Sequence, residues 1–362
     1  MILLTPLFLF LIVFVVDKVA WFPVVVQKGR AEQTPFEHLL RNIDTLKQSG
    51  PESRPWVVFL GSSRSEIFQH LHPTSIESSS LSKEAQALLT RFHLETRLPF
   101  KASSTLANFS FLERLLRPGP RPDLIVLEYS PEMLNLNGPF NAALFLQGNI
   151  LDRPLLRQIF PLMDLKSKLD ILIRLGFPAF HYHIRVERVL TAGPDDFDSV
   201  LTGMLFANRP PSTPLPDNYQ DFAAGDIPSA IYQERFLDYS DYLKNEFILK
   251  NYIISPVELR ALYESIALAR KAKIPLVLWI PPIHQELARR LATTEYAGRG
   301  AAIENDLADR ALLIRMPDLP CQRYVDSSHL SARCAPEVAH LLLSQAKEFY
   351  PQLTTTIRTE NR

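Results

Sequence analysis

Three short apolar runs place the tightest limits on how this chain folds. They read WVVFL at 56–60, LIVL at 124–127 and IPLVLWI at 274–280. Continuous apolar runs of this length are typical of strands that are buried on both faces of a parallel sheet. Helical patterns at 111–117 and 256–273 precede the second and third runs. Strands that alternate with helices predict an α/β fold with a doubly wound parallel sheet.

The size and charge of the chain suit one large domain that carries an insertion. Of its 362 residues, 46% are apolar and 22% are charged, which suffices for a large core. Lys and Arg together number 39, as do Asp and Glu, so the net charge gives no indication of a nucleic-acid partner. Between 137 and 252 the strand and helix patterns degrade, and a proline-rich stretch interrupts them at 208–218. We predict a mostly helical insertion there, which serves as a cap on the substrate side or as a structural brace.

The N-terminus begins with an apolar run that has the composition of a membrane span. No charge occurs from residue 2 to residue 16, and counting on to residue 26 gives the ~20 residues that a bilayer core needs. Trp21 and Lys28 are placed as interfacial anchors. We therefore predict a single-pass anchor at 1–27. A cleaved signal peptide is the rival interpretation, although a basic leader and a small-residue cleavage site are missing. A buried core helix is the other, although the run shows no polar face.

The first candidate for chemistry is the segment Gly61-Ser62-Ser63-Arg64-Ser65, which follows the first apolar run. A serine on such a turn holds its hydroxyl clear of the strand, and N–H groups at the start of the next helix can bind an oxyanion. The segment favours Ser63 as a nucleophile, although an ordinary helix N-cap would explain the same residues. Arg64 either binds an anionic headgroup or merely solvates the helix start.

The second candidate is Asp326-Ser327-Ser328-His329, which precedes a helical pattern near the C-terminus. Serine is a poor nucleophile until a base takes its proton, and a carboxylate is needed to fix the tautomer of that imidazole. Asp326 and His329 have these residue types at a suitable spacing. A chance Asp-x-x-His that caps the following helix is the alternative.

The remaining histidines do not predict a metal site. His70 with His72, and His181 with His183, form pairs that lack a neighbouring set of carboxylates or cysteines. We therefore expect neither a metal nor a cofactor. His284 follows the end of the third apolar run, where strand ends converge, and is a reserve candidate for substrate binding.

Two cysteines bracket the second candidate segment. Cys321 lies five residues before Asp326, and Cys334 lies five residues after His329. In an oxidising compartment they would form a disulfide that holds the two polar residues in register. In the cytoplasm the same cysteines would be buried thiols.

Taken together, the two candidate segments resemble the first and last sequence blocks of the SGNH (GDSL-like) hydrolases. Gly61 and Ser63 match the first block, in which Ser62 replaces an aspartate, and Asp326 and His329 match the last block. The resemblance implies an SGNH/flavodoxin-like three-layer sandwich with a Ser-Asp-His triad.

The resemblance extends to an uncharacterised family of membrane-anchored bacterial envelope proteins that share the SGNH core. It also extends, more distantly, to the D-alanyl transfer protein of teichoic-acid D-alanylation and to alginate O-acetyltransferases. The supporting segments are the N-terminal span with Asp17-Lys18, 61–65, the strand end at 277–282, and 326–331.

This wider resemblance implies acyl-ester chemistry on an envelope glycan, lipid or polymer, beside a multipass membrane O-acyltransferase. It also implies a domain outside the cytoplasmic membrane, in the periplasm, whereas Lys18, Lys28 and Arg30 would keep that flank cytoplasmic by the positive-inside rule. On this interpretation the chain comprises an anchor, a neck at 28–52, an SGNH-like domain at 53–352 and a tail at 353–362.

The oxyanion hole is where the sequence departs from this pattern. SGNH enzymes add a glycine and an asparagine from two middle blocks. Here the nearest residues are Ser103 or Ser104, and Asn135 or Asn137. The backbone of Ser63, with Ser103 and Asn135, makes up the candidate hole. The departure keeps a non-catalytic envelope scaffold open as the alternative function, and a soluble intracellular esterase remains a third.

Overall fold

The computed structural model describes residues 42–48, 54–99, 104–136, 252–316 and 319–354, with shorter pieces at 12, 15, 160–163, 165, 168–169, 172 and 222–223. The chain divides into two units, of which the first comprises Met1–Leu39 and Leu146–Asn218 and the second Leu40–Phe145 and Tyr219–Arg362. In the first unit, the described residues include the short 3-10 helix η4 (Phe160–Leu162). Apart from residues 12 and 15, the predicted anchor lies outside the described residues, as does most of the predicted insertion. Within the described part of the chain, no helix is long and apolar enough to cross a membrane.

The second unit is built on a five-stranded sheet in which all neighbouring strands are parallel. The strand order is β2-β1-β3-β5-β6. The three predicted apolar runs form its three adjacent inner strands, and every residue of these strands is buried. This confirms the predicted parallel α/β sheet. The strands are β1 (Trp56–Leu60), β2 (His93–Glu95), β3 (Leu124–Glu128), β5 (Leu276–Trp279) and β6 (Leu312–Ile314).

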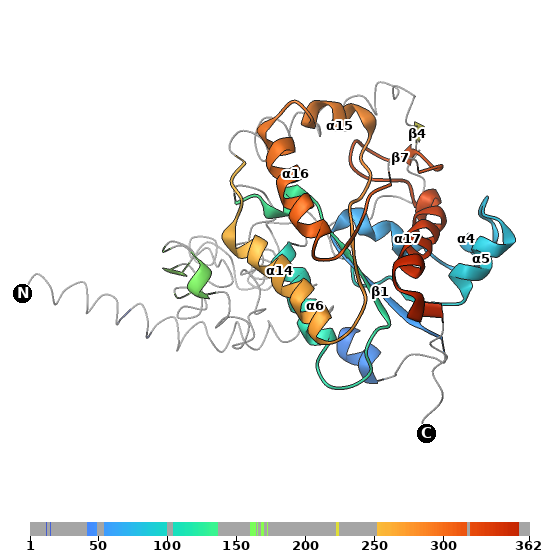
Figure 1. Cartoon of the computed structure of the whole chain (residues 1–362), viewed down its shortest axis with the longest axis horizontal. Coiled ribbons are helices and arrows are strands. Elements are labelled where there is room, and N and C mark those ends of the chain that lie inside the picture. The colour runs from blue at the N-terminus through green and yellow to red at the C-terminus, as the bar shows by residue number, and fades with distance from the viewer. Residues whose placement is uncertain are drawn as a thin grey trace, which may run out of the picture. The chain divides into compact units, whose positions relative to one another are not determined.

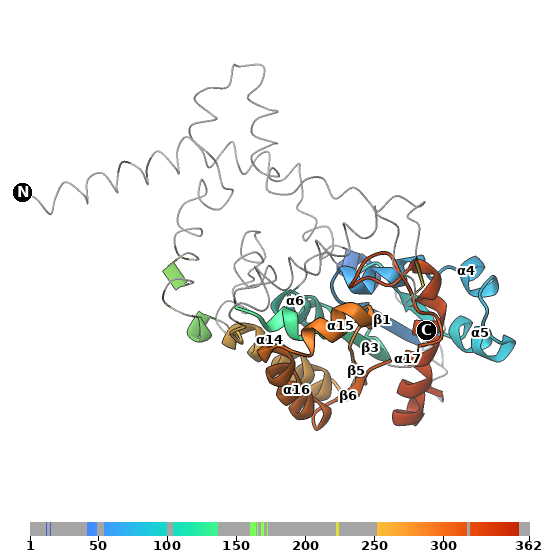
Figure 2. The ribbon, with the colours of Figure 1, turned by 90° about the horizontal axis from the view of Figure 1, so that it is seen from above.

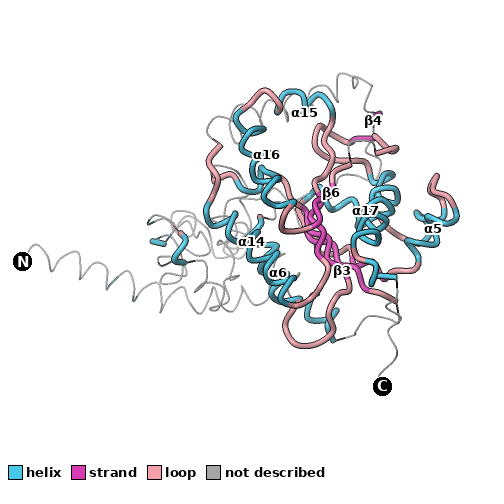
Figure 3. Tube along the Cα trace, in the orientation of Figure 1, coloured by secondary structure: helices cyan, strands magenta, loops and turns pink. Residues whose placement is uncertain are grey.

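Helices cover both faces of this sheet (Figures 1 and 3). On one face α6 contacts α14, and α16 packs beside β6. On the other face α17 contacts α5 and the 3-10 helix η2, and the view from above shows these two groups on opposite sides of the strands (Figure 2). The helices are η2 (Ser63–His70), α4 (Pro73–Glu77), α5 (Lys83–Thr90), α6 (Thr105–Leu115), α14 (Pro256–Lys271), α15 (Gln285–Leu291), α16 (Glu295–Ala308) and α17 (Ala335–Phe349).

The C-terminal helix α17 follows from its sequence pattern. Its buried residues recur with helical spacing, and they pack into the main core against β1, β3 and β5. At its far end the Tyr350 hydroxyl donates to the Leu276 carbonyl of β5 at 3.1 Å. The buried positions are Ala335, Pro336, Val338, Ala339, Leu342, Leu343 and Ala346.

The order of the strands creates a switch point between β1 and β3. From β1 the chain proceeds to β2 on one side, and it then crosses to β3 on the other side. Ligands in open parallel sheets bind in the crevice at the carboxyl ends of the strands at such a point. The residues that follow β1 and end β3 are therefore the first place to look for a site.

Smaller elements surround this edge. β4 (Phe222–Ala223) pairs antiparallel with β7 (Arg323–Tyr324), directly before the predicted Asp326 segment. The other short elements are the 3-10 helices η3 (Pro131–Leu134), η6 (Ala332–Cys334) and η7 (Pro351–Thr354).

Candidate active site

The turn after β1 can be made only with a glycine at its first position. A Cβ atom at Gly61 would overlap the Ser65 hydroxyl and the side chain of Glu128. Ser62 then caps η2, and Ser63 is the first residue of that helix. Beneath the turn, the Phe68 ring packs on Phe59 with ring centroids 4.2 Å apart, which fixes η2 against the sheet.

The structure brings Ser63, His329 and Asp326 into one hydrogen-bonded chain. The Ser63 Oγ lies 2.9 Å from Nε2 of His329. The Nδ1 atom of the same ring lies 2.8 Å from Oδ2 of Asp326. With its proton on Nδ1, the ring donates to the carboxylate and its Nε2 accepts the serine proton. These are the distances and the order that general-base activation of a serine requires.

Asp326 also shapes the loop that carries His329. Its Oδ1 accepts the backbone N–H groups of Ser328 and His329, each at 2.8 Å. The N–H of Val325 donates to the carbonyl of His329 at 3.0 Å, which closes the loop. A carboxylate that folds back on its own backbone in this way is typical of aspartate in turns.

The pKa of Asp326 lies below its ordinary value. Burial acts to raise this pKa, but the charge of His329 and the hydrogen bonds from His329 and Ser328 outweigh burial. Asp326 is therefore ionised at neutral pH and can orient and stabilise an imidazolium.

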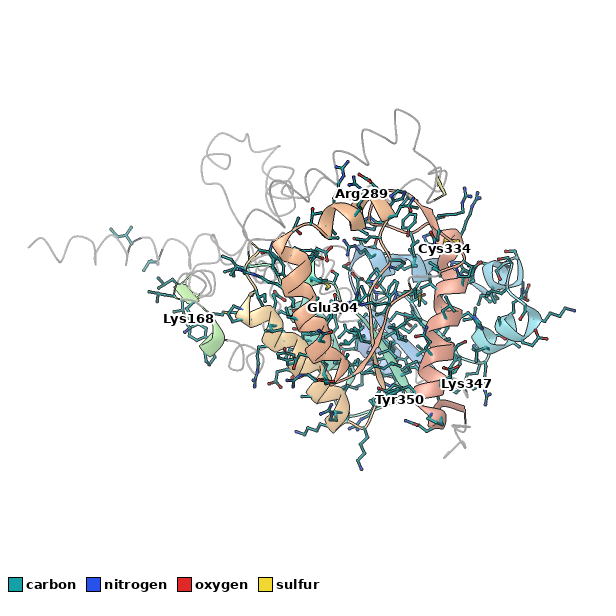
Figure 4. The ribbon with its side chains drawn as sticks, turned by 45° about the horizontal axis from the view of Figure 1, so that its top comes forward. Lys168, Arg289, Glu304, Cys334, Lys347 and Tyr350 are labelled. Atoms are coloured by element: carbon teal, nitrogen blue, oxygen red, sulfur yellow. A yellow bond between two sulfur atoms is a disulfide. The ribbon has the colours of Figure 1, made fainter. Side chains whose placement is uncertain are left out.

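Two further contacts hold this loop in place. Cys321 and Cys334 form a disulfide across it, at a sequence separation of 13. Cys334 directly precedes α17, at the opposite end of that helix from Tyr350 (Figure 4). From the other side, the N–H of His284 donates to the carbonyl of Ser327 at 2.9 Å. The loop is thus fixed both to α17 and to the segment between β5 and α15.

The side chain of His284, the reserve candidate, acts as a helix cap. Its Nδ1 accepts the N–H of Glu286 at 3.1 Å at the start of α15. The ring is 5% exposed and packs edge-on against Tyr324, with centroids 5.4 Å apart. Its backbone supports the His329 loop, and its ring is engaged in structure.

The backbone of η2 offers one free N–H for an oxyanion. The N–H of Ser62 donates to Glu128, and that of Ser65 donates to the Ser62 carbonyl at 3.0 Å. The N–H of Arg64 lies 3.4 Å from the Ser62 hydroxyl. Among the described residues, no acceptor bonds the N–H of Ser63. It belongs to the candidate nucleophile itself.

The other oxyanion candidates are placed differently. Ser103 and Asn137 lie outside the described residues. Ser104 caps α6, where its hydroxyl accepts the N–H of Ala107 at 3.2 Å. Asn135 is fully buried, and its Oδ1 lies 3.4 Å from the N–H of Ile253. Ser104 and Asn135 thus make structural hydrogen bonds.

Arg64 is paired with an internal carboxylate. Its guanidinium lies 3.1 Å from Oε1 of Glu132, and the two side chains are only 10% and 3% exposed. Burial acts to raise the pKa of Glu132, but Arg64, with a smaller effect of Tyr296, holds this pKa below its ordinary value. The charge that was predicted to bind an anionic headgroup or to face solvent is thus used within the protein.

Sequence reasoning missed Glu128, which closes β3. Its carboxylate accepts the N–H of Ser62 at 2.7 Å, the hydroxyl of Ser62 at 2.5 Å and the hydroxyl of Ser65 at 2.6 Å. The sequence interpretation ended this strand at Leu127 because a charged residue breaks an apolar run. An acidic residue at the carboxyl end of a central strand was the available signal.

Metal ligands do not cluster in the described part of the chain. No three His, Cys, Asp or Glu residues gather there in a group that could hold an ion. His70 and His72 are exposed, and His181 and His183 lie outside the described residues.

A family model matches most of the chain. A family described as a protein of unknown function (DUF1574) matches residues 1–159 and 224–346. The matched stretches include Ser63, Asp326 and His329. No curated protein matches the chain. Because the match covers well over half of its length, the chain belongs to the DUF1574 family.

Proposed function

We propose that this protein is a serine acyl-ester enzyme, an esterase or an O-acyltransferase, with Ser63 as its nucleophile. The observation that carries the proposal is the hydrogen-bonded chain from Ser63 through His329 to Asp326. Both distances lie within the normal hydrogen-bonding range, and the two ring nitrogens of the histidine face the two partners that such chemistry needs.

The reaction has two halves that use the same groups. In the first, Nε2 of His329 takes the proton of Ser63 as Oγ attacks the acyl carbonyl carbon. The N–H of Ser63 stabilises the oxyanion. His329 then returns the proton to the oxygen of the leaving alcohol, and the acyl group remains as an ester on Ser63. In the second half, water or an acceptor alcohol gives its proton to His329 and attacks this ester, and His329 returns that proton to the Ser63 Oγ as its bond to the acyl carbon breaks.

The finer fold and the location are also part of the proposal. The arrangement of helices on both faces of the sheet supports an SGNH-type three-layer sandwich. A disulfide beside the site supports an oxidising compartment, because such bonds persist outside the cytoplasm. We place the domain on the periplasmic side of the cytoplasmic membrane, tethered by residues 1–27. It would act there on an envelope glycan, lipid or polymer beside a multipass membrane O-acyltransferase.

A non-catalytic envelope scaffold is the second candidate. It is favoured by the oxyanion hole, to which the described residues contribute the Ser63 N–H while Ser104 and Asn135 are engaged elsewhere. Loss of one oxyanion donor typically lowers kcat by ~10²–10³. The scaffold would keep the fold and the partner while lacking turnover.

Labelling with a fluorophosphonate decides between these candidates. The full-length protein, purified in mild detergent, is treated with the probe and the adduct is located by peptide mass spectrometry. We expect an adduct on the Ser63 peptide that is lost in Ser63→Ala and His329→Ala. Ser78→Ala, at an exposed serine of the same domain, should label normally. A folded wild-type protein that takes up no probe would overturn the enzymatic proposal and favour the scaffold.

A further inference from the structure

The carboxylate of Glu128 lies where the switch point brings β3 against β1. Leu127 pairs with Leu60, and Glu128, the next residue in β3, pairs with Trp279 of β5. The side chain is 1% exposed and reaches the turn that follows Leu60. No residue of the proposed triad supplies this contact, and the reaction steps above do not use it.

Glu128 bonds residues on both sides of the nucleophile. One oxygen, Oε2, accepts the N–H of Ser62 and the hydroxyl of Ser65, and the other, Oε1, accepts the hydroxyl of Ser62. All three partners are donors, which suits an ionised carboxylate because it can only accept. Bonds to an ionised acceptor are shorter and stronger than neutral ones. Ser63 is therefore held between two residues that are bonded to the same buried group.

The backbone of the turn at Gly61 packs closely against Ser65 and Glu128. Gly61 is required because any side chain there would overlap Ser65 and Glu128. Since Glu128 takes up the N–H of Ser62, the free N–H of the turn is that of Ser63. In the first SGNH sequence block an aspartate stands at the position of Ser62. Here the carboxylate beside the turn is that of Glu128, which belongs to the neighbouring strand β3.

We propose that Glu128 is a positioning residue for the nucleophile. It acts through Ser62 and Ser65 and touches neither substrate nor the reacting atoms. Its three hydrogen bonds hold the Ser63 hydroxyl within reach of His329 and keep the Ser63 N–H aimed at the oxyanion. This inference rests on the proposed function and extends it to a residue outside the triad.

The decisive variant is Glu128→Gln, which keeps the shape of the side chain. The amide oxygen can still accept the N–H of Ser62, and the amide NH₂ can turn toward the Ser62 hydroxyl, so the fold is retained while the charge is lost. The matched control is Glu258→Gln. Glu258 is also fully buried and also bonds a helix start, through Thr105 and Leu106, but at α6.

The measurement is the rate of fluorophosphonate labelling at Ser63 as a function of probe concentration, well below the melting midpoints of all variants. We expect Glu128→Gln to lower the limiting rate by ~10- to 100-fold, because small misplacements of a reacting group cost this much. The half-saturating probe concentration should stay within about twofold, and Glu258→Gln should label like wild type. A purely structural role would lower the melting midpoint and leave the limiting rate of the folded protein unchanged.

The outcomes separate this inference from the proposed function. Labelled wild type with an equally fast Glu128→Gln overturns the positioning role alone. If wild type is not labelled, the proposed function fails, and crystal structures of wild type and Glu128→Gln then decide the positioning role. The role requires the Ser63 Oγ to His329 Nε2 distance, 2.9 Å here, to lengthen beyond hydrogen-bonding range in the variant. An unchanged distance overturns it.

Discussion

Two helices of the second unit begin in nearly the same way. Ser62 caps η2 and Ser104 caps α6, and each hydroxyl accepts a backbone N–H of its own first turn. Each helix start is also bonded by a buried glutamate from another element. Glu128 reaches η2 from β3, and Glu258 reaches α6 from α14.

The difference between these two starts lies in what surrounds them. Both oxygens of Glu128 accept donors, whereas Oε1 of Glu258 has no hydrogen-bond partner among the described residues. Burial raises the pKa of Glu258 to about 7, against the hydrogen bonds from Thr105 and Leu106 that lower it. Among the described residues, an imidazole lies opposite the first residue of η2, and none lies opposite the first residue of α6. The cap and the buried carboxylate are thus found at both helix starts. The start of η2 is a candidate site because His329 lies beside its first residue.

The strongest test of this comparison replaces the first residue of each helix. Ser63→Ala should lower hydrolysis of p-nitrophenyl acetate by at least ~10⁴-fold, because the nucleophile is removed. Thr105→Ala removes a hydrogen bond to Glu258 and should cost about 1–2 kcal/mol of unfolding free energy while leaving the rate of the folded protein unchanged. Similar losses of activity in both variants would show that the two helix starts are not functionally distinct.

The disulfide holds the loop that faces η2, so its removal should affect this loop more than the start of α6. Replacing Cys321 and Cys334 together by Ala removes a cross-link between residues at a sequence separation of 13 and should lower the free energy of unfolding by about 3 kcal/mol. Hydrogen exchange should quicken at the bonded N–H groups of Val325 and Ser331 in the loop. Exchange at the start of α6 should quicken less than exchange in the loop, and equal acceleration at both places would mean that the disulfide has no local effect on the loop.

Glu258 should also make the stability of the protein depend on pH. The pKa of Glu258 is raised from 4.5 to about 7, so the folded protein binds an extra proton between these values. The stability that this group contributes is fully present below about pH 4.5 and is lost as the pH rises through about 7. The loss is on the order of 3 kcal/mol. Urea unfolding at pH 5 and pH 8 should therefore show a smaller pH dependence in Glu258→Gln than in wild type. An identical dependence would exclude Glu258 as its source.

The smallest expected difference concerns the two caps. Ser62→Ala and Ser104→Ala each remove an N-cap hydroxyl, which costs about 1 kcal/mol in a thermal or urea melt. Only Ser62→Ala also removes a bond to Glu128, so only this variant should slow fluorophosphonate labelling of the folded protein. Equal labelling rates in the two cap variants would show that the hydroxyl of Ser62 does not help to position Ser63. Of the two bonds between Ser62 and Glu128, the one from the N–H would then be the one that does.

The sequence predicted the centre of the fold better than its edges. The apolar runs of β1, β3 and β5 are buried on both faces, and this is why they could be recognised. The edge strands β2 and β6 are three residues long and only partly buried, so their sequences carry no comparable signal. Strands are recognised in a sequence by the apolar residues that burial requires, and the strands at the edges of this sheet are less buried than those at its centre.

The candidate site divides in a similar way. Ser63, Asp326 and His329 could be proposed together because each lies in a short segment whose residue types suggest chemistry. The contacts of Glu128 and Glu132 could not be predicted, because they join the first turn of η2 to the end of β3 and to η3, at separations of 66 and 68 positions. Such contacts follow from strand order, which the local pattern does not contain.

The wide separation of the two halves of the site has a consequence during synthesis. Ser63 and His329 are 266 positions apart in the chain. At ~5–20 residues per second, the ribosome needs on the order of 10–50 s to add the histidine after the serine. Throughout that interval the emerging chain carries a serine without its base. Translation products that stop before residue 329 would therefore lack the proposed base, and any acyl-transfer activity would begin only after His329 has been added.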